Sequence, residues 1–450
     1  MKNNNIKLKI FLTITLLFLG LFALPKISQA TTYYVDQNHP QASDSNPGTE
    51  DLPWKTPNKA AQTLVAGDIV FIKEGSYFVG SGDWYLPALN PSNSGTPGNP
   101  IIFQAYPGHS VKLIATMKAI GAYQRDYIVW NGFIVETTNF SSNSEGASAI
   151  VSANYITIQN CELIGHTVDI NDNHQAIWMQ NASHVTIKNN IIRGVKGGNG
   201  SAGIKAYNTK NVLIENNEIY DCDTGIQSKH NGENWTIRYN YIHNCETGFV
   251  GGNATDQSYN YYFYIYQNIF ANLSFRALDP VGNFRYGKVY NNVFYNSGSS
   301  FVWGWSWGTW NAEFWNNIIV KSSETLYPCG DWYGSYTIDY WNYNAYSASS
   351  IIFEGSRNFS QWQDLGRDLN SFISDPLFVN AVSGNFHLAT NSPCINVGID
   401  RQDYDGDGNT TESINMGAYI TGNECIGLLD NCQQQSDTTP PAAPRNVMII

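Results

Sequence analysis

The sequence predicts an all-β protein built as a solenoid, a parallel β-helix in which short strands stack coil upon coil. Three observations support this prediction: a repeated strand and turn unit, Asn at matching places in the units, and a composition unlike that of a helical bundle. Only 14% of the 450 residues are charged and 39 are Gly, whereas helix-rich proteins need more Glu, Lys and Ala. Aromatic residues also reach 14%, which exceeds the needs of a core and predicts exposed rings.

The charge balance limits the partners that the chain can bind. Lys and Arg total 25 against 37 Asp and Glu, which gives a formal net charge of −12. An acidic protein is repelled by polyanions, so nucleic acid and anionic membrane surfaces are excluded as bulk partners. Exposed rings beside polar groups often indicate contacts with sugars or with proteins.

Residues 1–30 read as a secretory signal peptide. A basic stretch from Lys2 to Lys9 precedes an apolar run over 10–24, and Ser28-Gln29-Ala30 is a small-residue cleavage site. We expect cleavage after Ala30 and a secreted, extracellular product. Later segments have no apolar run of the length that spans a bilayer, so no membrane span is expected.

Internal repeats set the architecture. Eight segments align, and the seventh residue of the first and its equivalents in the others are spaced by 29, 29, 27, 23, 28, 24 and 25 residues. The aligned ranges are 127–135, 155–163, 184–192, 211–219, 234–242, 262–270, 286–294 and 311–319. This spacing is too irregular for propeller blades and too short for helical repeats, whereas coils of three short strands fit it.

Asn residues punctuate these units in two series. Stacked Asn amides can hydrogen-bond along the axis of a solenoid, and Asn tolerates the left-handed conformation of a tight corner. Since their positions follow the apolar residues, we prefer these roles to that of general loop polarity. The Asn residues are at 160, 189, 216 and 291 in one series and at 190, 217, 240, 268, 292 and 317 in the other.

The two ends of the repeat array differ from its middle, as a stack with an open core requires. Thr56-Pro57 predicts the start of a short capping helix that runs to about Leu64, before a strand over 69–73. Residues 375–400 predict a further strand pair. We therefore assign 31–422 to one β-helix domain, which needs no partner, so a monomer is expected. Residues 423–450 are assigned to a C-terminal linker or tail, where a following module would begin.

Three stretches resemble the secreted bacterial right-handed parallel β-helix proteins of the pectate lyase superfamily. They are YYVDQNHPQASDSNPGTEDLPWKTPNKAAQTLVAGDIVFIKEGSYF at the start, the Asn-punctuated coils, and SDPLFVNAVSGNFHLATNSPCINVGI near the end. The resemblance covers about 33–420. It implies a single-stranded right-handed parallel β-helix with a polysaccharide-acting surface along one sheet and, in the lyases of that superfamily, Ca2+ with a Lys or Arg base.

The coil spacing predicts which side chains share this outer surface. If Ile204 and Ile226 face the core, their neighbours Lys205 and Gln227 face outward side by side, and Tyr207 then lies beside Lys229. Trp178 and His230 belong to the same strip, and Arg276 follows Phe275 one coil further on in the same way.

These residue types suit β-elimination in a uronate polymer, which needs carboxylate neutralisation, a base and a proton for the leaving oxygen. We expect Lys229 as the base, with Arg276 and Lys205 binding the substrate carboxylate. Trp178, Tyr207 and His230 are the expected substrate contacts. Ca2+ would be bound by Asp172, Asp221 and Asp223. The alternative is that all of these are solvated charges on a strand face, paired with their neighbours.

Two further motifs lie outside this strip. In FVWGWSWGTW (301–310), Trp303, Trp305 and Trp307 alternate with small residues, so the three rings share one face of a strand and form either a sugar-stacking platform or a core plug. In DYDGDGNTTESI, Asp403, Asp405 and Asp407 occupy the first odd positions of a calcium loop, but Ile414 stands where a full loop needs a bidentate acid. This loop predicts either a structural calcium site or a plain polar loop.

The cysteines show no metal-ligating pattern. Seven Cys is an odd number, so at least one thiol stays free or pairs elsewhere; Cys425 and Cys432 enclose a short loop and could bridge. None of the seven has a zinc-site spacing.

Three function classes remain open from the sequence. A lyase acting on an anionic, uronate-containing glycan is favoured. A glycoside hydrolase on the same scaffold would need two outward carboxylates about 5–5.5 Å or about 6.5–9.5 Å apart. A non-catalytic glycan-binding or surface protein would present the Trp strip as its main exposed feature.

Overall fold

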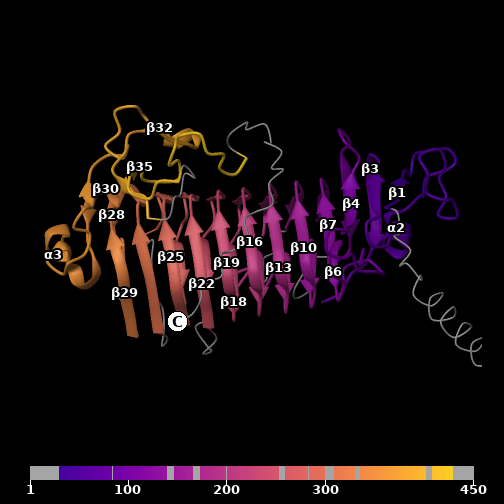
Figure 1. Ribbon diagram of the computed structural model, residues 1–450, viewed down its shortest axis with the longest axis horizontal. Coiled ribbons are helices and arrows are strands. Elements are labelled where there is room, and N and C mark those ends of the chain that lie inside the picture. Colours follow the sequence, from indigo (N-terminus) through magenta and orange to yellow (C-terminus); the bar gives the residue numbers. More distant parts are fainter. Residues whose placement is uncertain are drawn as a thin grey trace, which may run out of the picture.

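The computed structural model describes residues 30–83, 85–138, 146–165, 173–198, 200–252, 259–281, 283–298, 309–329, 335–401 and 408–428. Strands wind repeatedly around one long axis and stack into three parallel sheets, A, B and C (Figure 1). The predicted parallel β-helix is confirmed.

Sheets A and B run the whole length of the solenoid. Within the described residues sheet A comprises β1 (Thr32–Val35), β2 (Ile69–Ile72), β4 (Ile101–Ala105), β7 (Ile128–Asn131), β10 (Asn154–Gln159), β13 (Ser183–Lys188), β16 (Lys210–Glu215), β19 (Glu233–Arg238), β22 (Tyr259–Tyr266), β25 (Asn283–Tyr290), β27 (Thr309–Trp315) and β29 (Ser335–Asn342). Sheet B comprises β3 (Gly75–Gly80), β5 (Val111–Ala115), β8 (Ile134–Thr137), β11 (Glu162–Ile164), β14 (Ile191–Arg193), β17 (Glu218–Tyr220), β20 (Tyr241–His243), β23 (Ile269–Ala271), β26 (Val293–Tyr295), β28 (Ile318–Leu326), β30 (Ala345–Ile351) and β31 (Phe372–Ile373).

Sheet C is shorter and covers the central coils. Its strands in the described part of the chain are β6 (Ile120–Tyr123), β9 (Ser148–Val151), β12 (Gln175–Gln180), β15 (Ala202–Tyr207), β18 (Thr224–His230), β21 (Thr247–Gly251) and β24 (Arg276–Pro280). Each coil therefore runs from sheet A through a tight corner to sheet B, and then through a longer turn to sheet C.

The core is a set of side-chain columns along the axis. In sheet A, Ile156, Val185, Val212, Trp235 and Phe263 pair in register on successive strands, and all are buried. Alternate residues on these strands face the other side, which is the period-two pattern that predicted them.

The two Asn series have the expected roles. Asn160, Asn189, Asn216 and Asn291 adopt left-handed φ angles of 50–55° at the corner between sheets A and B. The second series forms a buried ladder; for example, Asn240 Oδ1 accepts hydrogen bonds from the backbone N and Nδ2 of Asn217 at 2.9 and 3.0 Å. The ladder thus satisfies backbone groups that the turn leaves without strand partners.

Short helices close both ends of the core. Helix α2 (Pro57–Thr63) starts at the predicted position, where the Thr56 side chain accepts a hydrogen bond from Lys59 N at 3.4 Å. Its Ala60 and Ala61 join the hydrophobic core. At the other end, helix α3 (Phe359–Gln363) buries Trp362 against the last coils.

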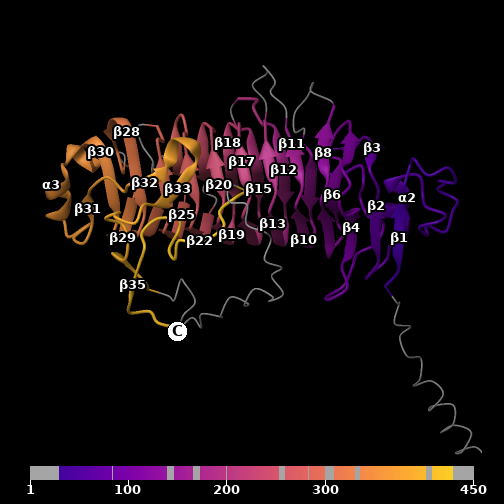
Figure 2. The same cartoon turned by 90° about the horizontal axis from the view of Figure 1, so that it is seen from above.

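The C-terminal segment folds back along the outer face of sheet B (Figure 2). It includes the antiparallel pairs β32 (Phe378–Asn380) with β33 (Asn385–Leu388) and β34 (Gly398–Ile399) with β35 (Ser413–Ile414), and a short 3-10 turn at Ala381–Ser383; another 3-10 turn, Glu354–Ser356, precedes helix α3. The first pair confirms the strand pair expected within 375–400. Phe386 of this segment is buried with sheet B residues such as Tyr241 and Ile269.

The cysteines are mainly buried thiols. Cys161, Cys222, Cys245, Cys329 and Cys394 are free, whereas Cys425 is disulfide-bonded. Cys432 lies outside the described residues. In the described part of the chain no helix is long and apolar enough to cross a bilayer.

Candidate functional site

The outer face of sheet C carries a ladder of side chains from five successive strands. Trp178, Lys205, Gln227, Val250 and Asp279 pair in this order across β12, β15, β18, β21 and β24. Lys205 lies between the core residues Ile204 and Ala206 in β15, so its side chain leaves the opposite face. The predicted pairing of Lys205 with Gln227 is confirmed.

The expected pairing of Tyr207 with Lys229 is wrong. A β-bulge in β18 inserts one extra residue, so Tyr207 pairs with His230, and their rings stack with centroids 5.2 Å apart. Lys229 still reaches the same ring, with its Nζ 5.7 Å from the Tyr207 centroid. The three residues therefore come together, but in a different order from that predicted.

The expected position of Arg276 is also wrong in detail. The core column of sheet C continues from Phe249 to Leu278, and not to Phe275. Phe275 precedes β24, which begins at Arg276, and is 41% exposed. Arg276 pairs with Thr247 and its guanidinium donates to Asp279 Oδ2 at 2.6 Å. Arg276 thus lies on sheet C, where its charge is matched by a carboxylate.

Lys205 is a buried amine. Its exposed fraction is 0%, and Nζ donates hydrogen bonds to Asn173 Oδ1 and the Gly200 carbonyl, which belong to the turns before β12 and β15. Burial, with the nearby charge of Lys229, lowers the pKa of Lys205 to about 7. A lysine with this pKa is partly neutral near pH 7 and can accept a proton.

Asp279 is the buried acid of the ladder. Burial raises its pKa to about 6, although Arg276 opposes this shift. Its Oδ1 and the Gln227 Oε1 are buried acceptors without a hydrogen-bond partner among the described residues. Such acceptors suit the hydroxyl groups of a ligand.

The N-terminal end of the ladder is aromatic. Trp178 is nearly buried, its ring lies 5.3 Å from that of Tyr85, and Lys118 Nζ lies 5.1 Å from its centroid. Sequence reasoning missed Tyr85 and Lys118, because they come from earlier coils that lack the repeat pattern.

Acidic side chains line the turns before sheet C. Asp223 Oδ2 accepts hydrogen bonds from the backbone N of Gly197 and Gly198, both at 2.8 Å. Burial, and then the charge of Asp223, raises the pKa of Glu246, while Arg276 lowers it. Glu246 and Asp223 are thus electrostatic neighbours.

Of the three residues expected to bind calcium beside sheet C, the structure describes Asp221 and Asp223, so the calcium site stays a prediction. Asp221 is exposed at a left-handed corner, Asp223 already binds two backbone amides, and no group of three His, Cys, Asp or Glu side chains in the described ranges could bind a metal ion. The other residues named for metal or sugar binding lie outside the described residues: Asp172, Trp303, Trp305, Trp307, Asp403, Asp405 and Asp407.

A family model supports the fold. Residues 122–319 match the family described as "Right handed beta helix region". Over these residues the chain is similar to that family, and the fold of the described residues is a parallel β-helix. The matched residues include all of the Trp178 to Asp279 ladder.

Two curated relatives match part of the chain. It is 28% identical over 166 residues to the uncharacterized protein YwoF of Bacillus subtilis (strain 168), covering 35% of this chain and 28% of that protein. It is 28% identical over 215 residues to the lacto-N-biosidase of Bifidobacterium longum subsp. longum, covering 45% of this chain and 13% of the enzyme. The chain therefore spans less than a third of either relative.

Two solved structures share the fold. Pectate lyase Pel9A superposes with a TM-score of 0.57 at 15% identity, covering 88% of this chain and 97% of that structure. The lacto-N-biosidase of Eubacterium ramulus gives a TM-score of 0.50 at 13% identity, covering 78% of this chain and 68% of that structure. The expected similarity to the fold of polysaccharide-acting β-helix proteins is confirmed.

Proposed function

We propose that this chain is a carbohydrate-active protein, and that sheet C cleaves an acidic, uronate-containing glycan by β-elimination. The observation that carries this proposal is the pair of amines on neighbouring coils, Lys205 and Lys229, beside the phenol of Tyr207. The shared fold with a pectate lyase supports the reaction class, while the curated lacto-N-biosidase supports carbohydrate chemistry more broadly.

The roles follow from the protonation states. Lys205, with its pKa near 7, is the base in place of Lys229, because only a neutral amine can take the proton from the carbon next to the substrate carboxylate. The Lys229 ammonium pairs with that carboxylate and stabilises the developing negative charge. The carbon–oxygen bond on the adjacent carbon then breaks as the double bond forms, and the Tyr207 hydroxyl donates a proton to the leaving oxygen.

Access to Lys205 requires a local rearrangement. The amine is enclosed by its hydrogen bonds to Asn173 and Gly200, so a substrate must displace these turn residues to reach it. This enclosure also explains why the pKa is low in the free protein, since water is excluded from the ammonium.

An unsaturated product tests the reaction. The chain is incubated with pectate, alginate or a glycosaminoglycan, with and without a chelator, and the absorbance of the new double bond is followed. We expect signal from wild type and a loss of more than about 100-fold in Lys205→Met, the usual scale for a general base. Lys188→Met, on sheet A, is the matched control. Loss of the signal with chelator would support the calcium prediction, which rests on residues outside those described.

The second candidate is a glycoside hydrolase that uses Asp223 and Glu246. Burial and the charge of Asp223 raise the pKa of Glu246, and a raised pKa is a property of the general acid in such enzymes. Reducing-sugar release without an unsaturated product, abolished in Glu246→Gln but not in Lys205→Met, would replace the lyase proposal with this one. Saturable glycan binding without turnover would leave a binding protein.

A further inference from the structure

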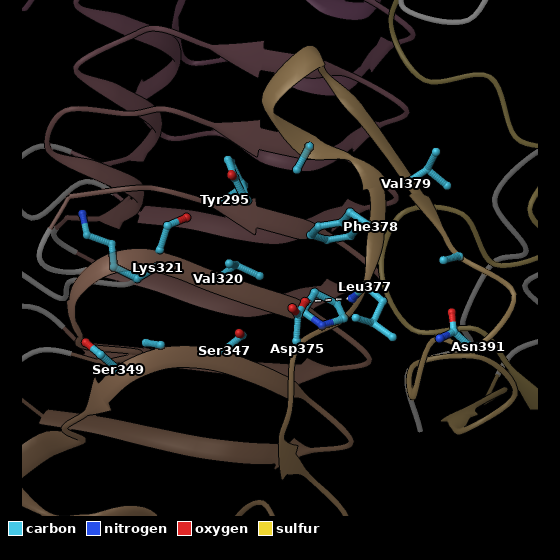
Figure 3. Close-up of a pocket in the computed structure, with 15 residues that line it drawn as sticks. Tyr295, Val320, Lys321, Ser347, Ser349, Asp375, Leu377, Phe378, Val379 and Asn391 are labelled. Atoms are coloured by element: carbon cyan, nitrogen blue, oxygen red, sulfur yellow. Dashed lines mark hydrogen bonds between the residues drawn. The ribbon is translucent and has the colours of Figure 1, made fainter.

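A groove lies between the outer face of sheet B and the returning C-terminal segment. Its volume is about 750 Å³. Figure 3 shows its floor on the sheet strands and its opposite wall on the chain around Asp375 to Val379. A volume of this size accommodates a small ligand or a few sugar units.

The floor is a flat row of outward side chains. Tyr295, Val320 and Ser347 pair in register on β26, β28 and β30. Phe378 extends from the wall toward this row (Figure 3), and its ring lies edge-on to Tyr295 with centroids 6.4 Å apart. Phe386 packs against both rings, with centroids 5.3 and 5.4 Å away.

The wall is hydrogen-bonded to the last coils of the solenoid and is braced by hydrogen bonds within the C-terminal segment. Ser374 N donates to Tyr346 O at 2.9 Å and Ala389 N donates to Leu377 O at 2.9 Å. The Ser392 hydroxyl donates to Pro376 O at 2.6 Å. The groove is therefore formed before any ligand arrives, which reduces the entropy cost of binding.

The polar groups of the groove match hydroxyl-rich ligands. The hydroxyls of Ser347 and Ser349 and the amide of Asn391 can each donate and accept hydrogen bonds, as sugar hydroxyls do. Tyr295 and Phe378 supply apolar ring surface beside them.

The charges of the groove favour a neutral ligand over an acidic one. The lysine that lines it, Lys321, donates to the Ser297 carbonyl and pairs with Glu324 at 3.1 Å, so its charge is already matched. Asp375 adds an exposed carboxylate, which would repel a uronate. Sheet C differs, since Lys205 and Lys229 bring two amines together there.

We infer that this groove is a second carbohydrate site, which binds an uncharged saccharide and takes no part in cleavage. It lies on a different sheet from Lys205, so a glycan with both neutral and acidic regions could be held at both sites. The inference does not depend on the reaction proposed for sheet C.

Calorimetric titration of the full chain with neutral and acidic oligosaccharides tests the inference. The neutral probes are hexasaccharides of xylose, glucose, mannose and galactose, and the acidic probe is an oligogalacturonate. Lys205→Met is included to remove turnover. We expect saturable binding of a neutral probe by wild type and by Lys205→Met, and binding at least about tenfold weaker in Ser347→Gln, whose longer side chain fills the floor.

Thr186→Gln is the matched control, because Thr186 occupies an outward position on the sheet A strand β13. It should bind as wild type does. Unchanged neutral-sugar binding by Ser347→Gln, binding of none of the neutral probes, or oligogalacturonate binding that Ser347→Gln removes would each overturn the inference.

Discussion

The amine of Lys229 lies 5.7 Å from the centroid of the Tyr207 ring, although Tyr207 pairs across sheet C with His230. The bulge in β18 explains both facts, because its extra residue lets two consecutive side chains approach one phenol. Bulges often redirect side chains next to functional sites. Here the result is a cation, an imidazole and a phenol beside the buried amine of Lys205.

Removing the Lys229 charge should change the pH dependence of the proposed reaction. Its repulsion helps to lower the pKa of Lys205, so Lys229→Met should raise that pKa. The base must be neutral to act, so the rate of wild type should rise with pH around pH 7. In Lys229→Met this rising limb of the pH–rate profile should move to higher pH. Rates of unsaturated-product formation from pH 5 to 10 measure this. An unmoved limb, with Lys188→Met as the control, would contradict Lys205 as the base.

The buried Lys205 should also make stability depend on pH. Its pKa is about 7 in the folded protein and 10.5 when unperturbed, so the unfolded chain binds more protons between these values and stability rises with pH across them. For each pH unit between the two pKa values the free energy of unfolding should change by roughly 1.4 kcal/mol, and the full destabilisation is present below pH 7. The free energy of unfolding of Lys205→Met should therefore exceed that of wild type by the largest amount near pH 6.

Urea unfolding of wild type and Lys205→Met at pH 6, 8 and 10 measures this difference. The lost hydrogen bonds to Asn173 and Gly200 add to this difference in unfolding free energy an amount that does not vary with pH. The change of the difference with pH, and not its size at one pH, therefore tests the prediction. A difference that is the same at all three values would mean that Lys205 keeps an ordinary pKa.

Truncating the middle of the Asn ladder should be costly. Asn240 is buried, and its Nδ2 donates to the carbonyls of Ile214 and Arg238 while its Oδ1 accepts from Asn217. Asn240→Ala leaves several buried groups unpaired, so we expect a loss of about 3 kcal/mol or more in unfolding free energy. The exposed Asn208→Ala should lose about 1 kcal/mol. Equal losses would show that the ladder adds little.

The returning segment should unfold separately from the first coils. Phe386 is 1% exposed and packs on Tyr241, Tyr295 and Phe378. Phe386→Ala should cost about 3–4 kcal/mol locally. Hydrogen exchange should quicken in β32, β33 and the covered strands of sheet B but not in β4 or β7, because distant coils of a solenoid are weakly coupled. Uniform quickening would contradict this.

The repeat pattern predicted the solenoid because each coil carries its own signals, such as the corner at Asn216 and the ladder at Asn217. The Lys205 to Gln227 pairing followed from coil length alone. The bulge at Lys229 could not be predicted from coil length, since nothing in the sequence marks where one extra residue enters a strand. Lys205 could be assigned to the right face, but its burial depends on Asn173 and Gly200 in turns of irregular length.

One signal was present in the sequence but was not used. The outward position that alternates between Ile and Glu in early coils, as Ile134, Glu162, Ile191 and Glu218, is apolar or aromatic in every coil from Tyr241 to Ile269 and Val293. An apolar row on an outer face requires a cover, and the C-terminal segment supplies it. This change to a continuously apolar row could have predicted where that segment packs, and with it the groove between sheet B and the segment.

The helices at the two ends have a consequence for self-association. A stack of parallel strands ends in exposed edges, and an uncovered terminal coil invites another copy to continue the stack into a fibre. Here Ala60 and Ala61 of α2 cover the core at one end of the solenoid, and Trp362 of α3 covers it at the other. Removing either capping helix should therefore favour head-to-tail polymers.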